Sequence, residues 1–221
     1  MYKFFFKRAI DFTLSLIALI ILTPILLPII IILLITGENY VFYFQERIGY
    51  KNSKFRIIKF ATMLKNSPNF GTKLHTTITD PRVLPFGKFL RSTKINELPQ
   101  LFNILIGDMS IVGPRPLVDK TFEPYSENIK NSIYNIKPGL SGIGSIIFRN
   151  EEELMSNTQM NLDDYYREKI APIKGELELW YQKNISFITD IKIILITIWI
   201  VFFPKSNIIN LFFKNLPKNK I

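Results

Sequence analysis

The sequence predicts an α+β protein, mostly helical, with an N-terminal re-entrant membrane helix, a small β-hairpin and amphipathic helices at a membrane interface. Three observations lead to this prediction. Residues 12–35 form an apolar stretch of 24 residues, two segments between 40 and 60 are rich in strand-forming side chains, and helical periodicity prevails further on. We divide the 221 residues into a membrane helix (1–37), a central domain (38–184) and an interfacial helix with a basic tail (185–221).

Composition limits the class of partner. The net charge is +10 and 48% of the residues are apolar, which favours anionic partners such as acidic lipid, nucleic acid or a phosphorylated molecule. The apolar ends and the absence of any run of five consecutive basic residues argue against nucleic acid. The absence of cysteine excludes disulfides and thiol nucleophiles, and the single histidine, His75, argues against zinc chemistry.

The apolar stretch at 12–35 predicts a permanent membrane helix. It is longer than the apolar core of a signal peptide, and no small-residue cleavage site follows it. Pro24 and Pro28 interrupt it, directly after Thr23. Each proline removes a backbone donor and clashes with the carbonyl four residues earlier, so we expect a kink between Thr23 and Pro28.

Two topologies fit such a kinked helix. It either spans the bilayer or bends at mid-depth and returns to its own side. Basic residues flank both ends: Lys3, Lys7 and Arg8 before it, and Arg47, Lys51, Lys54 and Arg56 after it. Because cytoplasmic flanks are enriched in Lys and Arg, this distribution favours the re-entrant form with both ends in the cytoplasm. A kinked single span is the alternative.

The central domain opens with a predicted hairpin. Residues 40–45 and 54–60 are rich in strand formers, and 48–52 has the composition of a turn. Residues 65–79 are polar and predict a loop that carries His75. Asp80-Pro81-Arg82 is expected to open a short helix that ends near residue 92.

Three further segments complete the domain. Residues 98–106 predict a helix that stops at Gly107, residues 137–144 a glycine-rich turn, and residues 162–183 a longer helix. In the tail, only residues 193–203 are free of charge, which is too short to cross a bilayer. Trp199 and the lysines that follow it favour a helix that lies flat at the interface.

Asn96 and Glu97 are the first candidates for chemistry. Asn96 is suited to cap the helix predicted at 98–106, with Pro99 in its first turn, and its amide is a poor nucleophile. Glu97 is expected in that first turn, where the positive helix end stabilises its anion and free amides can hold phosphate. A carboxylate there can bind Mg²⁺ that bridges a pyrophosphate, or attack phosphorus itself.

Arg115 is the strongest candidate for a phosphate contact. Gly113-Pro114-Arg115-Pro116 holds its guanidinium on a stiff backbone, in a form suited to bidentate binding. Asp108, after Gly107, is either a turn former or a member of the metal site. Four more basic residues are candidates for phosphate binding, with plain surface charge as the alternative: Arg47, Lys59, Arg82 and Arg91.

These motifs resemble those of the bacterial sugar transferases, the monotopic phosphoglycosyl transferases. The resemblance rests on residues 93–100, on Gly107-Asp108-Met109-Ser110, on Gly113-Pro114-Arg115-Pro116 and on blocks at 6–12, 45–49, 55–60, 86–91, 137–139 and 184–192. It implies a re-entrant helix broken at a Ser-Pro pair, where this chain has Thr23-Pro24. No large membrane domain precedes the first helix, so the chain is similar to the small, minimal form of the family.

The resemblance also implies an activity for the central domain. A sugar-1-phosphate would pass from a UDP-sugar to polyprenyl (undecaprenyl) phosphate with release of UMP and with Mg²⁺ as cofactor. This reaction would be the first membrane step of exopolysaccharide, lipopolysaccharide or capsule synthesis, on the cytoplasmic face of the bacterial inner membrane. The sugar pocket is expected around residues 149–153, and a homo-oligomer is one option for the assembly.

One position departs from the family pattern. The resemblance implies an Asp nucleophile before Glu97, and this chain has Asn96. Three interpretations stay open: Glu97 becomes the nucleophile, polyprenyl phosphate attacks directly, or the protein is a catalytically impaired membrane scaffold for glycan assembly.

Overall fold

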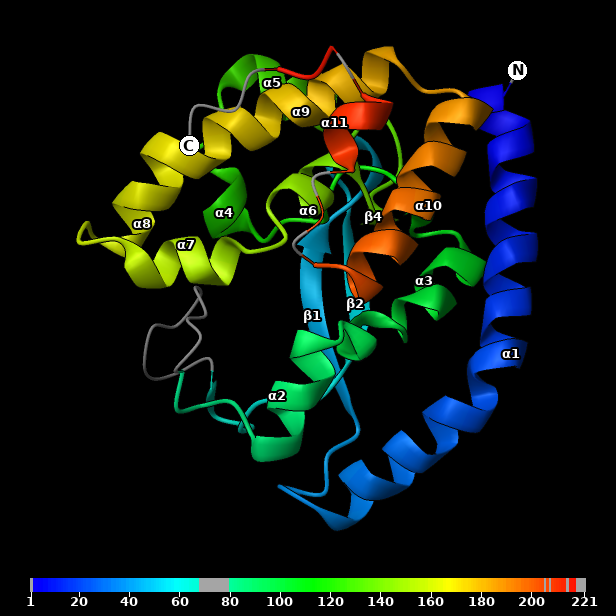
Figure 1. Cartoon of the computed structure of the whole chain (residues 1–221), viewed down its shortest axis with the longest axis vertical. Helices are drawn as coiled ribbons and strands as arrows, with labels where there is room; N and C mark the ends of the chain where they lie inside the picture. Colours follow the sequence, from blue (N-terminus) through cyan, green and yellow to red (C-terminus); the bar gives the residue numbers. More distant parts are fainter. Residues whose placement is uncertain (1, 68–79, 205, 207, 214, 218–221) are drawn as a thin grey trace.

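The long N-terminal helix is the largest element of the structure. In the computed structural model, which describes residues 2–67, 80–204, 206, 208–213 and 215–217, a π-helical turn at Tyr2–Phe6 leads into α1 (Lys7–Ile35). Both prolines lie inside α1, and Figure 1 shows the helix changing direction partway along its length, in agreement with the predicted kink. Within the described chain, α1 is the helix that is long and apolar enough to cross a membrane.

The first turns of α1 are polar and buried, because they pack against the protein. Lys7 donates to Asp190 Oδ2 over 2.6 Å, and Tyr181 donates to Asp190 Oδ1 over the same distance. Asp11 accepts from the amide of Ile111 at 3.0 Å. Lys7, one of the basic residues that flank the predicted membrane helix, is therefore buried and links the start of the chain to α10 near its end.

The predicted hairpin is confirmed, with small shifts. Strands β1 (Phe42–Ile48) and β2 (Lys54–Phe60) are antiparallel, with Phe42 opposite Phe60 and Ile48 opposite Lys54. The first strand begins two residues later than expected and runs on to Ile48, and a 3₁₀ turn at Tyr50–Asn52 joins the two strands.

The next helices are shorter than the sequence suggested. Helix α2 covers Pro85–Ser92, not 80–92, because Val83 pairs with Met63 in a β-bridge and Pro85 then occupies the first helical position. A 3₁₀ turn, η4 (Ile95–Glu97), precedes α3 (Gln100–Ile106). The predicted stop at Gly107 is confirmed: its φ of 101° is left-handed.

A second, parallel strand pair was missed. Strand β3 (Ser110–Val112) pairs with β4 (Gly139–Ser141), so part of the expected glycine-rich turn is a strand. Three-residue strands are too short to show alternation in sequence. The chains approach so closely here that a Cβ on Gly139 would lie 2.1 Å from the Gly113 nitrogen, which excludes any larger residue.

The remaining helices surround a second hydrophobic core, beside the one that α1, the hairpin and α3 share. They are α4 (Asp119–Phe122), α5 (Glu127–Ile133), α6 (Ile143–Ile147), α7 (Glu151–Asn157), α8 (Leu162–Tyr165), α9 (Ala171–Lys183), α10 (Phe187–Phe202) and α11 (Ile209–Phe212). A π-helical stretch at Tyr166–Ile170 joins α8 to α9, so the predicted helix at 162–183 is continuous.

Helix α10 has one face against the protein and one exposed face. Asp190, Ile193 and Ile196 are buried, while large apolar side chains such as Leu195, Trp199 and Phe202 are exposed. Figure 1 shows α10 between α1 and α6, close to the sheet strands. A helix is therefore present in the tail, but its exposed face is apolar like its buried face, so it lacks the polar face that an amphipathic helix would have.

We predict that Asp190→Ala lowers the free energy of unfolding by about 3–5 kcal/mol, because it leaves the Lys7 ammonium buried without its carboxylate. Thermal unfolding of the purified protein in lipid nanodiscs, followed by circular dichroism, measures the effect. Asp119→Ala is the matched control, because its carboxylate is exposed and its ion pair with Lys54 is worth less than about 1 kcal/mol. Equal losses for both variants would contradict the buried tether.

Candidate functional site

The candidate site is a pocket of about 1270 Å³ between the hairpin, η4, the loop that carries Arg115, and helices α6, α7 and α10. Of the described residues, nine basic and three acidic ones line it: Arg47, Lys59, Lys65, Arg82, Arg91, Lys94, Arg115, Arg149 and Lys174, and Glu97, Glu151 and Glu152. One wall is apolar and comes from α1 and α10, with Leu22, Ile25, Ile194, Ile198, Val201 and Phe202. The pocket thus joins an excess of positive charge to an apolar surface.

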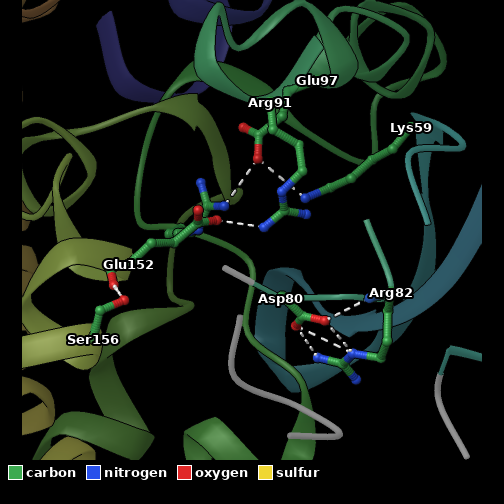
Figure 2. Close-up of polar contacts among 8 residues, drawn as sticks. Lys59, Asp80, Arg82, Arg91, Glu97, Glu152 and Ser156 are labelled. Carbon is green, nitrogen blue, oxygen red and sulfur yellow. Dashed lines mark hydrogen bonds and ion pairs between the residues drawn. The ribbon is translucent and has the colours of Figure 1, made fainter. Parts of the chain in front are cut away.

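Glu97 lies at the centre of the basic cluster. Its Oε1 accepts from Arg115 Nη2 at 2.9 Å and from Lys59 Nζ at 3.1 Å (Figure 2). Its side chain is 14% exposed. Burial alone would raise the pKa of Glu97, but the charges of Arg115 and Lys59 outweigh burial and hold this pKa well below its usual range. Glu97 is therefore an ionised carboxylate at neutral pH.

The other oxygen of Glu97 is open. Oε2 accepts no hydrogen bond from any residue that the structure describes, whereas Oε1 takes both. Since Glu97 lines the pocket, this oxygen is available to a ligand. One carboxylate oxygen, Oε1, is thus hydrogen-bonded to the protein, and the other, Oε2, is left for a ligand in the pocket.

Two strand residues supply further positive charge. Burial, with repulsion from Arg115 and Arg47, lowers the pKa of Lys59 to about 7. Arg47 donates through Nη1 to the carbonyl of Pro116 at 3.1 Å and through Nη2 to Gln45. Arg47 thus connects β1 to the Arg115 loop, and burial lowers its pKa to about 10.

The backbone of the loop that carries Arg115 is fixed by hydrogen bonds to Tyr134. The Tyr134 hydroxyl donates to the carbonyl of Arg115 at 2.8 Å and accepts from the amide of Leu117 at 2.9 Å. The Arg115 side chain is 37% exposed, so it reaches the pocket while its backbone stays fixed. This arrangement agrees with the stiffness expected of the Gly-Pro-Arg-Pro segment.

A left-handed residue positions Asn96 and Glu97. Lys94, with a φ of 62°, turns the chain from α2 into η4. For a residue with a Cβ this conformation costs about 1 kcal/mol or more. This strained residue forms the turn that directs Glu97 into the pocket. Lys94 itself also lines the pocket.

The expected cap at Asn96 is wrong. A 3₁₀ turn intervenes, so α3 begins at Gln100 after Pro99, and no described side chain caps it. Asn96 is instead 7% exposed, and its Oδ1 is buried without a partner among the described residues. Glu97 correspondingly lies before α3 and not in its first turn. Its anionic form is stabilised by Arg115 and Lys59 and not by a helix end.

Two candidates lie apart from Glu97. Asp108 follows Gly107 at the far end of α3, does not line the pocket, and acts electrostatically on Lys137. Arg82 is 1% exposed and forms a buried ion pair with Asp80, with Nη2 and Oδ2 2.6 Å apart (Figure 2). The structure therefore does not assemble Glu97 with Asp108, and it uses Arg82 to hold residues 80–82 in place.

Two charged residues of α9 were not predicted from the sequence: Lys174 lines the pocket, and Glu178 lies outside its lining. Lys174 contacts Glu151 Oε2 at 2.5 Å, and Glu178, four residues further along α9, is buried behind Arg115 and Gly144. Their spacing places two charged residues on the buried face of a helix, a signal that could have found them. Of the stretch predicted for the sugar, Arg149, Glu151 and Glu152 line the pocket and Glu153 is exposed outside it. His75 lies outside the described residues.

The chain belongs to the bacterial sugar transferase family, whose model, described as Bacterial sugar transferase, matches residues 2–204. This finding confirms the resemblance that the motifs indicated.

Individual relatives are named for the transfer of sugar phosphates. The chain is 34% identical over 204 residues to the UDP-glucose:undecaprenyl-phosphate glucose-1-phosphate transferase of Klebsiella pneumoniae, covering 91% of this chain and 41% of that protein. It is 32% identical over 196 residues to the UDP-N-acetylgalactosamine-undecaprenyl-phosphate N-acetylgalactosaminephosphotransferase of Aeromonas hydrophila, covering 88% and 43%.

A third relative is closer in length. The exopolysaccharide production protein ExoY of Sinorhizobium fredii is 34% identical over 174 residues, covering 72% of this chain and 76% of that protein. Against the Klebsiella and Aeromonas proteins, the chain spans only 41% and 43% of the relative's length. The two longer relatives are named for different sugars, so similarity to them does not select one sugar for this chain.

We predict that Glu178 gives the site a pH-dependent stability. Burial raises its pKa to about 8, from 4.5 in the unfolded chain, so the folded protein binds the extra proton between these values. The stabilisation that protonated Glu178 adds to the free energy of unfolding is fully present below pH 4.5 and is lost as the pH rises through 8. Between pH 5 and 9, wild type should lose on the order of 3 kcal/mol more stability than Glu178→Gln. Parallel stability–pH curves of the two proteins would contradict this.

Proposed function

We propose that this protein transfers a sugar-1-phosphate from a UDP-sugar to polyprenyl phosphate and releases UMP, as the first membrane step of a polysaccharide or glycoconjugate pathway. Family membership supports the class of reaction. The names of two relatives, which contain a UDP-sugar and undecaprenyl phosphate, support the two substrates.

One observation carries the proposal: an ionised carboxylate with one free oxygen inside a basic pocket that has an apolar wall. Diphosphate and phosphate groups are anions that require neutralisation. Besides Arg82, which Asp80 neutralises, eight basic side chains against three acidic ones provide it. The apolar wall from α1 and α10 gives a lipid-linked acceptor an approach to the same place.

The chemistry follows from the position of Glu97. Its Oε2 attacks the β-phosphorus of the UDP-sugar, and the bond from that phosphorus to the UMP oxygen breaks. UMP leaves, and the sugar phosphate is held on Glu97 as an acyl phosphate. An oxygen of polyprenyl phosphate then attacks the same phosphorus. The bond to Glu97 breaks and the carboxylate is regenerated. Arg115 and Lys59 neutralise the phosphoryl oxygens during both steps.

We include Mg²⁺ in the proposal, with the phosphates as its main ligands. The described residues contain no group of three metal-ligating side chains, and Asp108 lies outside the pocket. Mg²⁺ commonly takes one or two carboxylate oxygens and completes its shell with phosphates and water. The open Oε2 of Glu97 would fit such a site in the alternative in which polyprenyl phosphate attacks directly, because in the two-step route this oxygen is the nucleophile. When bound, the ion would neutralise charge on the diphosphate.

The membrane setting is the remaining part of the proposal. Helix α1 is kinked and largely exposed, with apolar residues such as Ile20, Ile21 and Ile31 on its surface, and α10 exposes an apolar face. We propose that α1 is re-entrant in the bacterial inner membrane and that α10 lies at its cytoplasmic face. The pocket between them would then open at the level of the lipid headgroups.

A scaffold without catalytic activity is the second candidate, and Asn96 favours it. The family resemblance implies a carboxylate at this position, and the buried amide cannot replace it as a nucleophile. The scaffold interpretation predicts that membranes with the protein release no UMP.

We predict that the protein in nanodiscs releases UMP from at least one UDP-sugar when polyprenyl phosphate and Mg²⁺ are present, and that Glu97→Gln lowers the rate at least about a thousandfold, because the acting oxygen is lost. A screen of UDP-sugars for UMP release measures this. Glu153→Gln is the matched control, since it is exposed on α7 outside the pocket, and it should retain the wild-type rate.

Two further measurements separate the mechanisms. A phosphosugar label retained on wild type and lost in Glu97→Gln assigns the nucleophile, whereas turnover without retained label indicates direct attack by polyprenyl phosphate. Asn96→Asp restores the carboxylate that the family pattern implies. An inactive wild type with an active Asn96→Asp would replace the enzyme proposal by the scaffold.

A further inference from the structure

The Glu152 carboxylate forms an ion pair with one of the cations that line the pocket. On α7, its Oε1 accepts from Arg91 Nη2, and both residues line the pocket (Figure 2). Figure 2 shows the Arg91 side chain reaching toward Glu152, with Lys59 approaching from the other side of Arg91. The residue expected to hold a substrate phosphate is therefore paired with a carboxylate of the protein itself.

The surroundings of Glu152 suit a phosphate. The ammonium of Lys94 lies close enough to both Glu97 and Glu152 to be attracted by their charges, and it is repelled by Arg149. Arg91 thus pairs with the Glu152 carboxylate directly, and Lys94 and Arg149 line the same pocket. Guanidinium groups bind carboxylates and phosphates in the same bidentate manner, so a phosphate oxygen can take the same place.

Glu152 can leave this position without undocking its helix. Its side chain is 41% exposed, so its charge can turn into water at little cost. Helix α7 is held by other contacts: Lys174 binds Glu151, and Met155 is buried in the core. The hydrogen bond from Ser156 reaches the backbone carbonyl of Glu152 and not its carboxylate.

Building on the function proposed above, we propose that Glu152 is an internal competitor for phosphate at Arg91, which a substrate phosphate must displace. The exchange makes and breaks only ion pairs. A phosphate carries more charge and more acceptor oxygens than a carboxylate and gains more at Arg91 than Glu152 loses. Glu152 thereby weakens anion binding at Arg91 by a few fold, and it disfavours weakly charged anions without contact with the sugar.

The test measures binding of UMP and of farnesyl phosphate, a soluble acceptor-type phosphate, to the full chain in nanodiscs by isothermal titration. Glu152→Gln removes the competing charge, and affinity should rise roughly two- to fivefold, the range that a partly exposed ion pair is worth. Glu152→Asp keeps the charge but shortens the reach to Arg91, so it should also tighten binding. Tightening for UMP alone places Arg91 with the donor, and for farnesyl phosphate alone with the acceptor.

Two controls make the result decisive. Glu153→Gln removes the same charge one residue along α7 and should leave affinity unchanged. In an Arg91→Gln background, Glu152→Gln should no longer tighten binding. Unchanged or weaker binding by Glu152→Gln, or equal tightening by Glu153→Gln, overturns the inference.

Binding needs no turnover, so the two proposals can fail separately. Tighter UMP binding by Glu152→Gln in a protein that turns over no UDP-sugar would support the competitor and contradict the transferase. Normal turnover with unchanged affinity would do the opposite.

Discussion

The buried contact between Lys7 and Asp190 holds the two ends of this chain together, and the pocket depends on it. Lys7 belongs to the first turn of α1 and Asp190 to the first turn of α10. An ammonium and a carboxylate removed from water are costly unless they are paired and hydrogen-bonded, and Tyr181 supplies the further hydrogen bond. Because α1 and α10 both contribute to the apolar wall, this contact aligns the two exposed apolar helices with the basic cluster.

The basic cluster around Glu97 is held together by hydrogen bonds that either fix a cation in place or let two cations share one carboxylate oxygen. Arg47 and Tyr134 fix the loop that carries Arg115, and Arg115 and Lys59 share one oxygen of Glu97. Such an arrangement limits the reorganisation needed when a charged ligand enters, which is the usual source of electrostatic catalysis. The other oxygen of Glu97 stays outside this network.

Much of the fold could be predicted from the sequence, because its signals are local. A long apolar stretch with two prolines defines α1, and alternation over seven residues defines β2. The β3–β4 pair could not be predicted, since it joins segments of three residues that are far apart in the chain. For the site, Glu97, Lys59 and Arg115 were predicted as candidates, and they do meet in the pocket. Arg82 and Asp108 were also predicted as ligands, but tertiary contacts place them elsewhere. The interpretation of Asn96 failed because an inserted 3₁₀ turn moved the start of α3 by two residues beyond the expected position.

The order of synthesis gives the Lys7–Asp190 contact a consequence for biogenesis. A ribosome makes α1 first and Asp190 more than 180 residues later. In the membrane setting proposed above, α1 would be free to enter the bilayer during that interval, before the partner of Lys7 has been made. Helix α10, which supplies part of the apolar wall, is also made late, so the pocket would be completed only near the end of synthesis.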